Sequence, residues 1–127
     1  MRRDNGSGSG LNVHERILVR IGIIMQKMHL RRAMKHVNEQ AGSQSLQEHF
    51  ARVKRKGIQI QLLNTENRAD DPAVMKIVAE IQEATDALET EVALLEHATD
   101  KGEQVKEIIA KGNAAIERID SLIEFVA

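Results

Sequence analysis

The strongest constraint on the fold of this chain is a long apolar repeat in its second half. Apolar or small residues recur there at alternating spacings of four and three. The first run of the repeat comprises Val74, Val78, Ile81, Thr85, Leu88, Val92, Leu95 and Thr99. The second run comprises Val105, Ile109, Gly112, Ile116, Ile119, Ile123 and Val126. This heptad-like spacing predicts two long amphipathic helices, each of which buries one face.

Start and stop signals divide the chain into four helical segments. Asp71-Pro72 is typical of a helix start, and the stretch from Asp100 to Glu103 is typical of a turn followed by a second start. Gly42 is predicted to end the first helix, and Ser45 with Glu48 matches a capping box for the next. We therefore predict an all-α antiparallel bundle of three to four long helices at about residues 11–41, 45–64, 72–98 and 103–126.

Composition agrees with a single helical domain at residues 11–127. Aromatic residues make up 2% of the chain, so the core must consist of aliphatic side chains. The sequence has no cysteine, which excludes disulfides, a thiolate nucleophile and cysteine-ligated metal sites. Residues 1–10 resemble a flexible Gly/Ser leader or linker, either native or engineered. This leader lacks the apolar core of a signal peptide, so we expect a cytoplasmic protein.

The first helical segment changes its apolar face along its length. Its first half gathers apolar side chains on one face, namely Ile17, Leu18, Ile21, Ile24, Met25 and Met28. Beyond Met28 this face is basic, and the apolar side chains lie nearly opposite. The helix is therefore expected to bend near His29 or to change its packing partner, and the second arrangement leaves an apolar patch for another chain. The candidate interaction surface comprises Leu18, Met25, Met28, Leu30, Met34 and Val37.

Charge is distributed unevenly between the two halves of the chain. Residues 1–57 contain 12 Lys and Arg against 4 Asp and Glu, whereas residues 58–127 contain 6 against 15. Either the two halves neutralise each other across the bundle, or the basic half contacts an anionic partner. The candidate anion-binding residues are Arg31, Arg32, Lys35, Arg52, Lys54, Arg55 and Lys56.

Sequence motifs for catalysis or metal binding are absent. No two of the five histidines have the four-residue spacing of HExxH, no Glu precedes a His by three residues, and no phosphate-binding glycine motif occurs. The carboxylates of the third segment fall mostly outside the apolar repeat, where water keeps them ionised. We therefore predict no catalytic residue, no cofactor and no metal site. No run of apolar residues is long enough to span a membrane, because Arg20 and Lys27 interrupt the first segment.

These features favour a non-enzymatic helical module for protein–protein interaction. An adaptor, an assembly factor, a secretion-type chaperone or a self-associating subunit would each fit, with a protein partner or a homo-oligomer. The alternative is a nucleic-acid-binding protein whose basic N-terminal half contacts phosphates. Nothing in the sequence indicates a small-molecule substrate.

Overall fold

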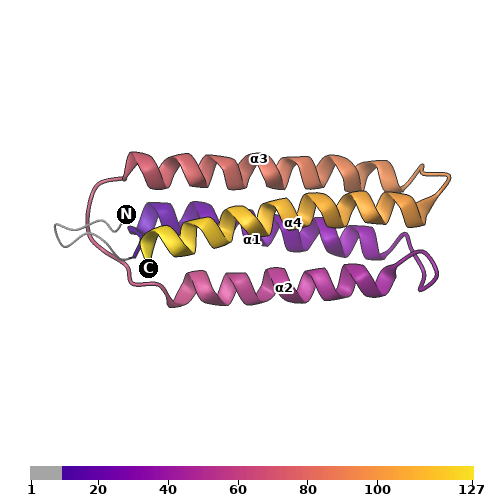
Figure 1. The fold of residues 1–127 in the computed structure, drawn as a ribbon, viewed down its shortest axis with the longest axis horizontal. Helices are drawn as coiled ribbons and strands as arrows, with labels where there is room; N and C mark the ends of the chain where they lie inside the picture. Colours follow the sequence, from indigo (N-terminus) through magenta and orange to yellow (C-terminus); the bar gives the residue numbers. More distant parts are fainter. Residues whose placement is uncertain (1–9) are drawn as a thin grey trace.

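The computed structural model confirms the predicted all-α fold and shows four helices in the residues that it describes, 10–127 (Figure 1). The helices are α1 (Val13–Met34), α2 (Ser43–Leu62), α3 (Pro72–Leu95) and α4 (Lys101–Val126). The predicted leader at residues 1–10 lies outside the described residues, except for Gly10.

The helices form two antiparallel hairpins that pack side by side. α1 packs against α2, and α3 packs against α4, while α1 also contacts α3 and α2 also contacts α4. The pairs α1 and α4, and α2 and α3, therefore lie diagonally across the bundle. The connection from α2 to α3 crosses the end of the bundle at which α1 begins and α4 ends (Figure 1). We refer to residues 63–71 as the crossover loop.

Helix starts in the second half agree with the sequence signals. The Asp71 side chain accepts a hydrogen bond from the backbone N of Ala73, and Pro72 occupies the first turn. The Asp100 side chain accepts from the backbone N of Glu103, and the chain reverses there as predicted. α3 ends at Leu95, three residues before the predicted end, and α4 begins at Lys101, two residues before the predicted start.

The first hairpin corrects three predictions. α1 ends at Met34 and not near residue 41, because Asn38 organises a turn in which its side chain and its carbonyl accept from the backbone N of Ala41. Gly42 does not terminate α1; it immediately precedes α2, with a φ of 109° that favours glycine. The capping box predicted at Ser45 is wrong, because α2 already begins at Ser43.

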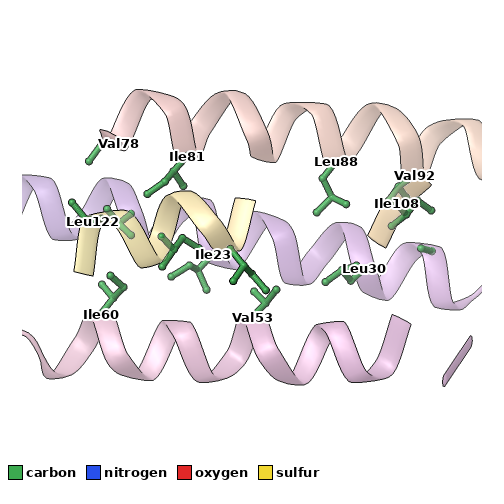
Figure 2. Close-up of a cluster of buried hydrophobic side chains, with 14 of the residues drawn as sticks. Ile23, Leu30, Val53, Ile60, Val78, Ile81, Leu88, Val92, Ile108 and Leu122 are labelled. Carbon is green, nitrogen blue, oxygen red and sulfur yellow. The ribbon is translucent and has the colours of Figure 1, made fainter. Parts of the chain in front are cut away.

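The core of the bundle follows the apolar repeat closely in α3. Every repeat position within α3 is buried, and Thr99, beyond the helix end, is exposed. Side chains from all four helices meet along the bundle axis (Figure 2). In α4 the buried face is shifted, because this helix contacts both α3 and α2. Ile108, Ala115 and Leu122 are buried there, whereas the predicted core positions Ile109 and Ile123 are only half-buried.

A buried ion pair closes the end of the bundle at which α1 begins. The Glu15 side chain is fully buried and accepts from Arg68 Nη2 at 3.1 Å and from the backbone N of Asp71 at 2.8 Å. Glu15 also forms a capping box with Asn12 at the start of α1. The crossover loop is thus tied to α1 by charge-assisted hydrogen bonds, which explains how an acidic residue is accommodated in the interior.

Candidate interaction surface on α1

The outward face of α1 is a continuous row of apolar side chains, which we call the outer stripe. It consists of Val13, Ile17, Ile21, Ile24 and Met28, at spacings of four, four, three and four residues. Their exposed fractions run from 46% to 60%. At 1.5 Å per residue the stripe is about 22 Å long. Isolated exposed apolar residues are ordinary, whereas a contiguous row of large ones on one helix face is a candidate for an interaction surface.

The buried face of α1 is mixed, because it includes polar residues and a glycine while large apolar side chains such as Ile17 and Ile21 remain on the solvent side. Four of its eight buried positions are polar residues or glycine. Gly22 lets α3 approach closely, since a Cβ there would lie 3.3 Å from Cγ2 of Ile81. Gln26 donates to the Thr85 hydroxyl at 3.2 Å. Close packing on α3 and this hydrogen bond are consistent with the orientation of α1, in which Ile23 and Leu30 face the core and Ile17, Ile21, Ile24 and Met28 face outward.

α1 is one uninterrupted helix through His29. The face of α1 that packs inward is the same along its length, from Glu15 through Val19 and Gln26 to Ala33. α1 does expose apolar side chains, but they are those of the outer stripe and differ from the predicted set in all but Met28.

The outer stripe borders a groove between α1 and α2, which we call the α1/α2 groove. The groove has a volume of about 180 Å³, and Ile24 of the stripe lines it. From α2 it is lined by Gly57 and by Ile58, whose exposed fraction is 53%. A Cβ at Gly57 would lie 3.2 Å from the Ile23 side chain, so the glycine permits the close approach of the two helices.

The rim of the α1/α2 groove is basic. Arg20 and Lys27 of α1 and Lys54 of α2 line it, and no acidic residue does. Within residues 10–127, none of these three cations has an ion-pair partner. The single acidic residue of α1, Glu15, is buried and paired with Arg68. The solvent-facing side of α1 therefore combines apolar side chains with positive charge alone.

The six residues predicted for the interaction surface lie in different environments, from the core to the outer stripe. Leu30 is fully buried in the core and cannot contact a partner in this fold. Met34 and Val37 are partly buried against the core, as is Leu18. Met25 is half-buried, and Met28 alone of the six belongs to the outer stripe. The prediction missed Val13, Ile17, Ile21 and Ile24, and the available signal was the row of Glu15, Gly22 and Gln26 on the opposite face.

The seven basic residues predicted to bind anions do not form one surface. Arg32 pairs with Glu96 at 2.8 Å, which lowers the pKa of the Glu96 carboxyl, and Lys56 pairs with Asp120 at 2.6 Å. The remaining five are at the surface and face different directions. Among them, Arg31 lies over the Phe50 ring, with 4.9 Å between its guanidinium carbon and the ring centroid. Lys35 caps α1 and is exposed. Lys54 faces the α1/α2 groove, and the groove between α2 and α4 receives Arg52 and Arg55.

The groove between α2 and α4 is the larger of the two, at about 770 Å³, and carries both signs of charge. Glu117 and Asp120 line it from α4, and the pair of Lys56 with Asp120 spans it. Arg52 donates to the Asn113 side chain and, at 3.0 Å, to Nδ1 of the buried His49. Burial, and then the Arg52 charge, lower the pKa of His49 to about 4. Many of the polar side chains that line this groove therefore already have partners within the chain.

Among residues 10–127, no group of three or more His, Cys, Asp or Glu side chains is arranged to hold a metal ion. None of the helices in this part of the chain has the length and hydrophobicity needed to cross a membrane.

Comparison of the chain with protein-family models, with curated proteins and with solved structures finds no match.

Proposed function

We propose that this protein is a non-enzymatic helical interaction module and that the outer stripe of α1 is the surface by which it binds another protein. The observation that carries the proposal is the row of large apolar side chains that α1 leaves on its solvent side. A helix that serves only its own bundle gains most by burying its largest apolar side chains, at about 25 cal/mol for each Å² removed from water. In α1 the row from Ile17 to Met28 is left about half exposed.

The outer stripe also has the geometry of a helix-binding surface. Its residues recur at spacings of three and four, which is the arrangement by which an amphipathic helix is recognised along its length. The buried residues of the four helices already form a complete core, so the stripe is not needed to close the bundle. Adaptor, assembly-factor and chaperone roles all rest on such a surface. Nucleic-acid binding has weaker support, because the basic residues face several directions and two of them are in ion pairs.

Site-specific photocrosslinking in the source cells tests this proposal. A photoreactive amino acid at position 21, in the stripe, is compared with the same amino acid at position 83, on the exposed side of α3. We expect a discrete crosslinked protein from position 21 and none from position 83. The adduct should disappear when Ile17→Ser and Ile24→Ser are introduced together with helicity retained. The absence of an adduct at position 21, or the same adduct at both positions, would overturn the proposal.

A further inference from the structure

We infer that the partner of the outer stripe is an acidic amphipathic α-helix that lies along α1 and extends into the α1/α2 groove. This inference rests on the proposed function and specifies the chemistry of the partner. It is carried by the combination, on one side of the molecule, of an apolar row, a groove and three cations that have no ion-pair partner in residues 10–127.

Shape favours a rod-like partner. The stripe runs the length of four helical turns, and Ile24 connects it to Ile58 on α2 across the α1/α2 groove. The segment from Ile17 to Met28 has spacings of four, three and four, which match the seam of two packed helices. A partner helix that places its own apolar seam on this row would cover Ile21 and Ile24 at its centre.

The positive charge of the α1/α2 groove predicts the charge of the residues that flank the partner's apolar seam. Arg20, Lys27 and Lys54 line the groove beside the stripe and have no ion-pair partner within the described residues. Carboxylates at the positions flanking the partner's seam would meet these cations as the interface excludes water, and the attraction is strongest there. A helix with lysines at those positions would meet like charges.

A second copy of this chain does not have the required chemistry. Two α1 helices packed stripe to stripe would bring Arg20 and Lys27 of one molecule close to the same residues of the other. The acidic α3/α4 hairpin could supply carboxylates, but Leu94 is its single exposed large apolar side chain in the described chain. Neither surface of a second molecule therefore offers both an apolar seam and negative charge.

An anionic membrane would also combine apolar and negative groups, but the surroundings of the stripe disfavour it. α3 flanks α1 on the side away from α2. Glu96, just after α3, pairs with Arg32 of α1, so this side of α3 faces α1. Glu89 lies seven residues earlier, on the same helix face, and is exposed. A flat anionic surface lying on the stripe would therefore approach the Glu89 carboxylate, whereas a single helix in the α1/α2 groove would not.

The test measures binding of the full chain to two fluorescent three-heptad peptides by anisotropy. Both peptides have leucine at the seam positions, and they differ only in carrying glutamate or lysine at the flanking positions. We expect the glutamate peptide to bind at least about tenfold more tightly than the lysine peptide at physiological salt. The double substitution Arg20→Glu with Lys27→Glu should reverse that preference. The matched control Arg55→Glu, which lies outside the α1/α2 groove, should change the affinities by less than about twofold.

Three results would overturn the inference. The first is equal binding of the two peptides, or a preference that the double charge reversal leaves unchanged. The second is stripe-dependent binding to phosphatidylcholine vesicles containing phosphatidylglycerol, which would identify a lipid surface. The third is a dimer of the chain that Ile21→Ser dissociates, which would identify a second copy. If crosslinking from position 21 still yields a discrete protein adduct in any of these cases, the proposed function stands and this inference alone fails.

Discussion

The buried imidazole of His49 packs against α4 at Gly112, a residue without a side chain. Its Nδ1 accepts from Arg52, so the ring proton is on Nε2, and this nitrogen faces Gly112 without a hydrogen-bond partner in the described structure. A Cβ at position 112 would lie 2.7 Å from Cε1 of the imidazole. The glycine is therefore needed for packing between α2 and α4.

Gly112→Ala should destabilise the protein by about 1 to 3 kcal/mol, because the added methyl group overpacks the contact with His49. In an open helical position the same change would stabilise by up to about 1 kcal/mol. Gly102→Ala is the matched control in the same helix, where the nearest atom to the new Cβ is Asp100 Oδ1 at an ordinary 3.5 Å. Urea unfolding measures both variants. If both are equally stable or stabilised, the packing role of Gly112 is wrong.

The buried imidazole of His49 also predicts a dependence of stability on pH. Its pKa is lowered from 6.5 to about 4 in the folded protein, so the unfolded chain takes up this proton at higher pH. The contribution of neutral His49 is complete above about pH 6.5 and is lost as the pH falls toward 4. Between pH 7.5 and 4.5 the loss in free energy of unfolding should be about 2 to 3 kcal/mol.

Carboxylates titrate over part of the same pH range, and they do so both in the natural chain and in the variant His49→Gln. Comparison of the two proteins therefore isolates the contribution of His49. The pKa of Asp70 is lowered by hydrogen bonds from Asn12 and His14, and that of Glu96 by Arg32, and both contributions remain in the variant. The variant should lose clearly less stability than the natural chain between pH 7.5 and 4.5 in urea unfolding. Identical pH profiles would contradict the assignment to His49.

At the scale of the elements, the sequence predicted α3 well and α1 poorly, for a physical reason. α3 has one apolar face, and its repeat from Val74 to Leu95 has a single way to be buried. α1 has large apolar residues on both sides, with Ile23 and Leu30 in the core and the outer stripe at the surface, and its buried side also includes Gly22 and Gln26. Periodicity selects the side with the larger apolar residues. Close packing on α3 instead selects the side that includes Gly22, and that depends on a neighbour distant in sequence.

The same difference between α1 and α3 explains why the candidate interaction surface was only partly predicted. The change of apolar face along the first helical segment correctly indicated that its apolar residues could not all be buried in one stripe. That change of face did not locate the exposed row, because the exposed face depends on the burial of Glu15, which Arg68 and the backbone N of Asp71 in the crossover loop support together. Ile58 was missed because its neighbours in the α1/α2 groove come from a different helix.

At the scale of the whole molecule, the uneven charge of the two halves is only partly neutralised inside the bundle. Arg32 with Glu96 and Lys56 with Asp120 connect the basic first half to the acidic second half. The cations beside the outer stripe have no such partner in residues 10–127. The bundle therefore has a basic, apolar side on α1 and α2, and its core is complete without covering that side.

The central claim is that α1 leaves a row of large apolar side chains exposed to solvent, and thiol labelling of the full chain tests it most directly. The natural sequence has no cysteine, so a single one can be introduced at either face. Ile21 is 50% exposed and Val19 is fully buried. We expect the thiol of Ile21→Cys to react in native buffer nearly as fast as in urea, and that of Val19→Cys to react at least about a hundredfold more slowly than in urea. Protection at position 21 with rapid labelling at position 19 would contradict the account.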